Sequence, residues 1–212
     1  MASPDWRDQI IYFAMIDRFD DGDPRNNDQG QLEFDATQNA KYSGGDLRGL
    51  TNRVDYLREL GATALWITPP VAHRWWDAQA NYGGYHGYWG EHFKRVDAHF
   101  GSLRNYRNLS RALHRRDMYL IQDIVVNHMA NWFGYGTGFD AADPTRAFAL
   151  NPDSDRRSAP SQPPFDLNDV RDPKQRAAAI YHWTPEIRDH ASRDQELNYQ
   201  LADLDDLNTE SA

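Results

Sequence analysis

Three short apolar runs mark the chain, and each has the length of a β-strand. They are IIYFAMI, which follows Gln9 and ends at residue 16, TALWITPP at 63–70, and MYLIQDIVV at 118–126. Such runs, rich in β-branched and aromatic side chains and bounded by turn residues, are typical of strands. The third run holds six apolar residues between Met118 and Val126, so we expect that strand to be buried on both faces.

Two segments between these runs have the spacing of helices. Residues 47–61 and about 103–116 are predicted to be helical, and Gly61 stands where a helix C-terminus favours glycine. The apolar residues of the first segment recur at helical spacing, at Leu47, Leu50, Val54, Leu57 and Leu60. Apolar strands that alternate with helices predict a parallel α/β sheet.

The periodic pattern ends after residue 129. Residues 130–170 are loop-like and contain five prolines, and a short helix is expected near 173–190. We therefore divide the chain into residues 1–129, which hold the sheet, and residues 130–212. The second part is predicted to be an irregular subdomain inserted after the third strand.

Composition narrows the partners that the chain can have. It holds 23 basic and 32 acidic residues, a formal net charge of −9, and phosphate binding needs clustered Lys and Arg, so we expect no nucleic-acid partner. The sequence contains no cysteine, which excludes disulfides and thiolate chemistry. No apolar segment approaches the ~20 residues of a membrane span, and the start MASPDWRDQ does not have the pattern of a signal peptide.

The long polar loop after the first strand concentrates oxygen-bearing side chains. In DDGDPRNND, Asp21, Asp23, Asn26 and Asn27 stand close together around a Gly-Pro turn. Hard cations such as Ca²⁺ prefer oxygen ligands of this kind, although the spacing is not that of an EF-hand. The alternative is a solvated turn in which these side chains only cap backbone groups.

Further candidate residues follow the second and third strands. The stretch NYGGYHGYW places His86 between Tyr85 and Tyr88, and the third strand ends in Asn127 and His128. Parallel α/β folds build their sites at this end of the strands. An aromatic ring there could stack on a sugar while His86 donates a hydrogen bond; the alternative is a glycine-rich loop that only packs on the rim. The motifs of zinc proteases, serine hydrolases and nucleotide-binding loops do not occur.

Together these motifs resemble one family. DIVVNH at 123–128, GATALWITPP, YHGYW and LADLD at 201–205 occur in the order found in the alpha-amylase family of glycoside hydrolases. The family also includes cyclodextrin-forming and maltogenic enzymes, and DGDPRNN followed by GGD at 44–46 is similar to the calcium loop of the cyclodextrin-forming branch. The resemblance implies a partial (β/α)8 TIM barrel, of which this chain holds the first three strands, with domain B inserted after the third.

The resemblance also implies roles for individual residues. The family's central calcium would be bound by Asn127 and Asp203. A second Ca²⁺ would be bound by Asp21, Asp23, Asn26, Asn27, Asp46 and the carbonyl of Gly44. The substrate subsite at the cleaved bond would be lined by His86, Tyr88 and His128, with Tyr88 as the stacking platform. Asp123 would support the strand end through hydrogen bonds.

The implied reaction is retaining hydrolysis, or glycosyl transfer, at α-1,4 bonds of starch-like glucans. Its nucleophile and acid/base would lie beyond Ala212, so we expect the 212-residue chain alone to be inactive and to depend on the missing C-terminal half of the barrel. A secreted or periplasmic location is expected. The rivals are a non-catalytic carbohydrate- or calcium-binding module and a transporter-associated homologue without glycosidase activity.

Overall fold

A three-stranded parallel sheet lies at the centre of the computed structural model, which describes residues 4–151 and 157–210. Its strands are β1 (Ile11–Ala14), β2 (Ala64–Ile67) and β7 (Tyr119–Gln122), in the order β1-β2-β7. The register pairs Phe13 with Trp66, and Trp66 with Ile121. The three predicted strands and their parallel order are confirmed, although each is shorter than its apolar run.

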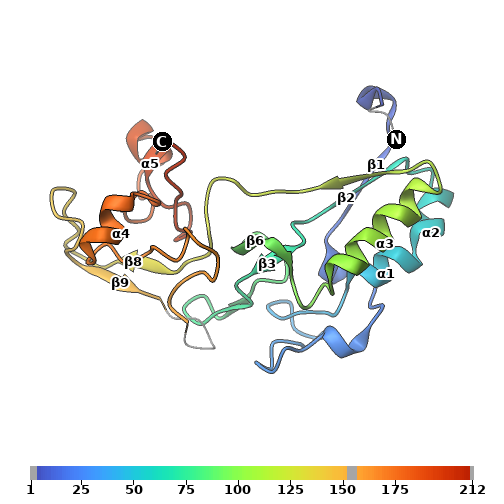
Figure 1. Ribbon diagram of the computed structural model, residues 1–212, viewed down its shortest axis with the longest axis horizontal. Helices are drawn as coiled ribbons and strands as arrows, with labels where there is room; N and C mark the ends of the chain where they lie inside the picture. Colours follow the sequence, from blue (N-terminus) through green and yellow to red (C-terminus); the bar gives the residue numbers. More distant parts are fainter. Residues whose placement is uncertain (1–3, 152–156, 211–212) are drawn as a thin grey trace.

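Three helices cover one face of this sheet (Figure 1): α1 (Leu47–Asn52), α2 (Val54–Glu59) and α3 (Leu103–His114). Their apolar stripes pack on the sheet in one buried cluster that includes Leu47, Leu50, Leu57, Leu65, Ile67, Leu109 and Leu113. The segment predicted as one helix over 47–61 is two, because Arg53, with φ −101° and ψ 7°, interrupts the helical backbone. Asp46 caps α1 and Ser102 forms a capping box on α3.

The opposite face of the sheet is open to solvent. Phe13 is 46% exposed and Trp66 is 39% exposed, while Ile124 and Val126 beyond β7 are 65% and 68% exposed. The prediction that the third strand is buried on both faces is therefore wrong for this chain. Within the described ranges no helix packs on this face as α1 to α3 do on the other (Figure 1), so its apolar side chains remain in contact with water.

The connection from β2 to α3 is more ordered than the predicted loop. It contains two small antiparallel pairs, of β3 (Val71–His73) with β6 (Gly90–Val96), and of β4 (Trp76–Asp77) with β5 (Tyr82–Gly83). Three short 3₁₀ turns precede α1, at Trp6–Asp8, Ile16–Arg18 and Pro24–Asn26.

A second unit follows β7 and lies at the other end of the molecule (Figure 1). It contains β8 (Phe133–Tyr135), β9 (Phe148–Leu150), α4 (Pro173–Ala178) and α5 (Arg193–Asn198). Its own core is made of Met129, Trp132, Phe133, Val170 and Tyr181. The helix expected over 173–190 ends earlier than predicted, because Ala179 adopts a left-handed conformation with φ 48°. In the described part of the chain no helix is long and apolar enough to cross a membrane.

Candidate functional site

The loop that follows β1 folds back onto the start of α1 and brings together most of its oxygen-bearing residues. Asn26 Nδ2 donates to Asp46 Oδ2 at 3.1 Å, and Asn27 Nδ2 donates to Asp21 Oδ2 at 2.7 Å. We call Asp21, Asn26, Asn27, Gly44 and Asp46 the oxygen cluster. Residues that are 25 positions apart in sequence thus meet at one place beside the sheet.

The position of Gly44 in the oxygen cluster requires a glycine. Its φ is +91°, a region that side-chain-bearing residues rarely adopt. A Cβ at this position would lie 2.6 Å from Asn27 Nδ2 and 3.0 Å from Asp21 Oδ2. The absence of a side chain therefore lets the backbone of residue 44 approach the two loop residues directly.

The oxygen cluster fits a hard cation in its donor types. The Oδ1 atoms of Asn26 and Asn27 are buried and have no hydrogen-bond partner among the described residues, which is costly unless another group satisfies them. Asp46 is fully buried, and burial raises the pKa of its carboxyl. Among the described residues, no three or more His, Cys, Asp or Glu side chains form a metal-binding group. The oxygen cluster has two carboxylates and depends on amides, so its calcium role stays a prediction.

Asp23 does not point into the oxygen cluster. Its carboxylate accepts two hydrogen bonds from Arg25, each 2.7 Å long, and lies 3.6 Å from Arg48. The hydrogen bond from the Arg25 side chain lowers the pKa of Asp23 to about 2. The structure therefore places the side chain of this predicted ligand with two arginines.

The three residues predicted to bind substrate lie in direct contact. The rings of His86 and Tyr88 stack with centroids 5.8 Å apart and 21° between their planes. His128 Nε2 lies 3.2 Å from the carbonyl oxygen of Tyr88, and the Tyr88 hydroxyl donates to Asp123 Oδ2 at 2.8 Å. We call His86, Tyr88, Asp123 and His128 the aromatic cluster. As predicted, Asp123 forms a supporting hydrogen bond at the strand end, and its partner is Tyr88.

Gly87 explains how the chain turns between the two rings. It has φ +83°, and a Cβ there would lie 2.2 Å from the carbonyl oxygen of Pro69. The turn can pack against the end of β2 only because residue 87 has no side chain. The glycine of the YHGYW motif thus positions His86 and Tyr88 at the carboxyl edge of the sheet.

Both histidines of the aromatic cluster are neutral at pH 7. Burial, followed by the nearby His73 and Arg18, lowers the pKa of His86 to about 4. Its Nδ1 accepts a 3.0 Å hydrogen bond from the Tyr88 amide, so the proton is on Nε2, which can donate to a ligand. Burial also lowers the pKa of His128. The Tyr88 phenol stays protonated, because burial and the hydrogen bond to Asp123 raise its pKa to about 12.

The carboxylate beside Asn127 is Asp206, which the sequence analysis did not assign. Asn127 Nδ2 donates to Asp206 Oδ1 at 3.2 Å, and His182 Nδ1 lies 2.5 Å from Asp206 Oδ2. Asp203 instead lines a cavity of 210 Å³ with Asp77 and other residues. The structure therefore gives Asn127 a carboxylate partner in Asp206, and the pairing of Asn127 with Asp203 stays a prediction.

A signal for Asp206 is also present in the sequence. LADLD at 201–205 and LDDLN at 204–208 are two overlapping copies of one pattern, shifted by three residues. The match to the first copy selects Asp203, and the match to the second selects Asp206. The second copy lies beside Asn127 in the structure, because Leu207 N donates to the carbonyl oxygen of Asn127 at 2.9 Å.

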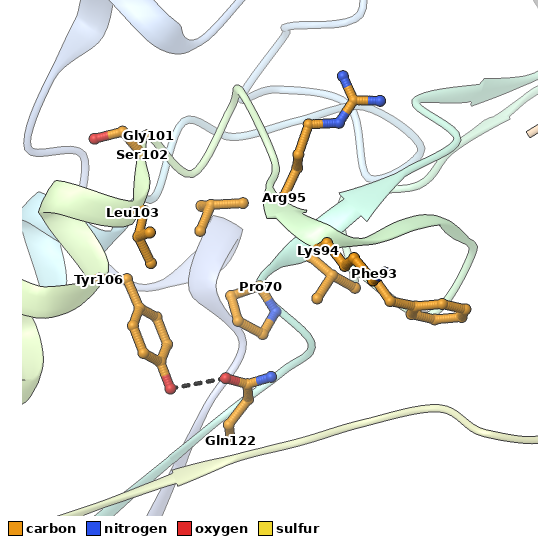
Figure 2. A pocket seen from close by; sticks show the side chains of 11 residues that line it. Pro70, Phe93, Lys94, Arg95, Gly101, Ser102, Leu103, Tyr106 and Gln122 are labelled. Carbon is orange, nitrogen blue, oxygen red and sulfur yellow. Dashed lines mark hydrogen bonds between the residues drawn. The ribbon is translucent and has the colours of Figure 1, made fainter. Parts of the chain in front are cut away.

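The largest cavity that we describe is not lined by any predicted site residue. It has a volume of 520 Å³ and lies between β6 and the start of α3, where Figure 2 shows Pro70, Phe93, Arg95, Leu103 and Tyr106 around it. Tyr106 donates a 2.7 Å hydrogen bond to Gln122 at its base. A second cavity, of 350 Å³, is lined by Asp123, by Val125 and by the exposed side chains of Ile124 and Val126, among others. We take the two clusters as the candidate site: the aromatic cluster holds two histidines and an aromatic platform, and the oxygen cluster holds buried oxygens without partners.

Three parallel strands whose carboxyl ends lead towards these clusters agree with part of an α/β barrel, a class of fold that builds its sites at the strand ends. The family model described as alpha amylase, catalytic domain, matches residues 13–212. The chain therefore belongs to the alpha-amylase catalytic-domain family.

Individual relatives agree with this family. The chain is 45% identical over 127 residues to a cyclomaltodextrin glucanotransferase of Klebsiella oxytoca, covering 58% of this chain and 19% of the relative. It is 36% identical over 140 residues to the periplasmic alpha-amylase of Escherichia coli strain K12, covering 63% and 20%. A solved alpha-amylase of Geobacillus thermoleovorans, complexed with acarbose, superposes with a TM-score of 0.66 at 30% identity over 99% of this chain and 35% of that chain. The matched region is about a fifth of the length of these curated relatives.

Proposed function

We propose that this chain forms the first part of the catalytic domain of a glycoside hydrolase that acts on α-1,4-linked glucans. The single observation that supports this most is the aromatic cluster, in which Tyr88 is already held by Asp123 and His86 already has its donor proton on Nε2. Rigid, preformed contacts of this kind are what a sugar-binding subsite needs. A glucose ring would stack on Tyr88 while His86 donates to one of its hydroxyls.

Retaining hydrolysis needs two carboxyl groups about 5–5.5 Å apart on either side of the scissile bond. Asp123 is the carboxylate of the aromatic cluster, and it accepts the hydrogen bond of Tyr88. We propose that the nucleophile and the acid/base are supplied from outside the 212 residues, by the remainder of a barrel. The chain alone would then bind glucan without cleaving it.

We also propose two calcium sites. Asp21, Asn26, Asn27, Asp46 and the Gly44 carbonyl would hold one ion, supported by the two buried amide oxygens without partners. Asn127 and Asp206 would contribute to a second site. Bound Ca²⁺ would supply charge compensation for buried carboxylates and would fix the loops that carry the aromatic cluster.

A location outside the cytoplasm is part of the same proposal. It is supported by the relative named as a periplasmic alpha-amylase, to which 63% of this chain aligns. The surplus of acidic residues also agrees with a protein that binds neutral glucans and cations rather than nucleic acids.

Calorimetric titration of the 212-residue chain tests the proposed function. We expect maltoheptaose to bind in the presence of calcium, and cellohexaose, a β-linked chain, to bind at least tenfold more weakly. Tyr88→Ala should weaken maltoheptaose binding at least tenfold, whereas Tyr56→Ala, on the exposed side of α2 with 50% of Tyr56 accessible, should not. Equal binding of both glucans, or no effect of Tyr88→Ala, would refute the proposal.

A starch assay tests the assignment of the carboxylates. We expect no reducing-sugar release from soluble starch by the 212-residue chain with calcium present. Turnover at rates typical of enzymes, on the order of 1 to 10³ per second, would show that the nucleophile and acid/base lie within these residues. The acidic segment 203–206 would then be mutated first.

A further inference from the structure

A hollow separate from the aromatic cluster lies between the loop at 31–41 and the β4–β5 hairpin. It has a volume of 340 Å³. Its lining side chains include one large aromatic ring, Trp76, and a surrounding set of amides and one ammonium group, Gln31, Gln38, Asn81 and Lys41. We call it the Trp76 hollow.

Trp76 faces this hollow because successive side chains of a strand point to opposite faces. Its neighbour on β4, Asp77, turns the other way and is 3% exposed, against the cavity that also holds Asp203. The Trp76 ring is half-buried and makes no aromatic ring contact in the described part of the chain, whereas Trp66 and Trp89 make edge-to-face contacts. One face of a large indole is therefore available at the wall of a concave surface.

The polar groups around the ring are three neutral amides and one ammonium group. Gln31 and Asn81 are exposed, and their side chains make no hydrogen bond to other described residues. Gln38 donates to Asp35 at 2.7 Å and keeps its Oε1 as an acceptor. The Lys41 ammonium donates to the carbonyl oxygen of Leu32 at 2.7 Å, so its charge is partly satisfied within the loop.

The loop at 31–41, which carries Gln31 and Gln38, is held in place by a buried carboxylate. Glu33, at the base of the loop, is 1% exposed, accepts the amide of Gln31 at 2.8 Å, and lies 3.0 Å from His99. The hairpin is joined to the same loop by the 2.8 Å hydrogen bond from Gly83 N to the carbonyl oxygen of Ala40. The hollow is thus preformed, which reduces the entropy cost of binding.

We propose that the Trp76 hollow is a second carbohydrate-docking site that takes one sugar ring of a neutral α-glucan stacked on Trp76. A planar apolar ring bordered by amides matches the apolar face and the hydroxyl edge of a pyranose. The choice of an α-glucan rests on the proposed function. It is supported by the uncharged amides of Gln31, Gln38 and Asn81 beside the ring, which match the uncharged hydroxyls of a glucan.

Titration of maltoheptaose into the 212-residue chain with calcium tests this site through two variants. Trp76→Ala should weaken binding roughly tenfold, the change that about 1.4 kcal/mol produces. Trp76→Tyr, which keeps an aromatic ring, should recover most of the affinity. The matched control is Trp6→Ala, because Trp6 is 44% exposed in the first 3₁₀ turn and packs on Tyr119.

The outcomes separate this inference from the proposed function. Loss of affinity in Trp76→Ala with wild-type affinity in Tyr88→Ala would support the Trp76 hollow and refute the aromatic cluster. The reverse pattern would overturn the Trp76 hollow alone, and failure of the wild-type chain to bind maltoheptaose would overturn both. Thermal melts of each variant check folding. If both variants melt as the wild type does and Trp76→Tyr binds no better than Trp76→Ala, the stacking role of Trp76 is also overturned.

Discussion

Replacing His99 with glutamine should destabilise the fold and remove most of its sensitivity to alkaline pH. His99 is 2% exposed and lies between two buried carboxylates, with its Nδ1 2.9 Å from Asp97 and its Nε2 3.0 Å from Glu33. Its ring also stacks on Tyr42, with centroids 3.9 Å apart. The charged imidazole therefore joins the turn before α3 to the loop that borders the Trp76 hollow.

The magnitude follows from the electrostatics. Burial alone would lower the pKa of His99, but hydrogen bonds with Asp97 and Glu33 raise it from 6.5 to about 9. A shift of this size corresponds to about 3 kcal/mol. Since the pKa is raised in the folded state, this stabilisation is complete below pH 6.5 and is lost as the pH rises through about 9.

Glu33 sets the acidic limit of the same network. Burial opposes its ionisation, but the hydrogen bond with His99 and those from backbone amides lower its pKa from 4.5 to about 2. Its contribution is therefore present above pH 4.5 and is lost as the pH falls through about 2. The network is expected to stabilise the fold most between pH 4.5 and 6.5.

Urea unfolding at pH 6 and at pH 9.5 checks the prediction. His99→Gln leaves two buried carboxylates without their cation and should lower the free energy of unfolding at pH 6 by about 3–5 kcal/mol. The control is His190→Gln, whose side chain is 68% exposed beside Glu196 and should change stability by less than about 0.5 kcal/mol. The wild type should lose stability between the two pH values and His99→Gln should lose much less; parallel losses would refute the reasoning.

Three further predictions concern the cation sites and Tyr88. Gly44→Ala, which forces a Cβ to 2.6 Å from Asn27 Nδ2, should abolish most of the rise in melting temperature that calcium gives the wild type; an unchanged rise would contradict the oxygen cluster. Asp206→Asn should weaken calcium binding at least tenfold in a chelator competition, whereas Asp203→Asn should change it less than twofold. The opposite order would support Asp203 as the calcium ligand paired with Asn127. Ultraviolet titration should show the Tyr88 phenol ionising near pH 12, and Asp123→Asn should lower that value because the carboxylate raises it; no difference between the two titrations would refute the hydrogen bond.

Much of the sheet and its site could be predicted from the sequence, because the signals are local. Apolar runs identified the three strands, and the position of His128 after the third placed it at the functional edge. The GGD and YHGYW patterns contain Gly44 and Gly87, and in the structure the backbone of each approaches another chain segment. These features depend on residues close together in sequence.

Features that depend on distant contacts were not predictable in the same way. The apolar run at 118–126 has the composition of a fully buried strand, yet its burial depends on elements that pack on the second face. The interruption of the helix at Arg53 could not be predicted, because no proline or glycine stands at that position. The hydrogen bond between Asn127 and Asp206 was not predicted, because the two residues lie 79 positions apart in sequence. The partner of His99 could not be identified either, because Glu33 lies 66 residues away in a polar loop.

A crystal structure of the 212-residue chain grown with maltoheptaose and calcium chloride tests most directly whether Tyr88 and His86 bind sugar. We predict a glucose ring stacked on Tyr88, with one hydroxyl within hydrogen-bond distance of His86 Nε2. Sugar density that is absent from Tyr88 but present elsewhere on the molecule would refute the sugar-binding role of the aromatic cluster.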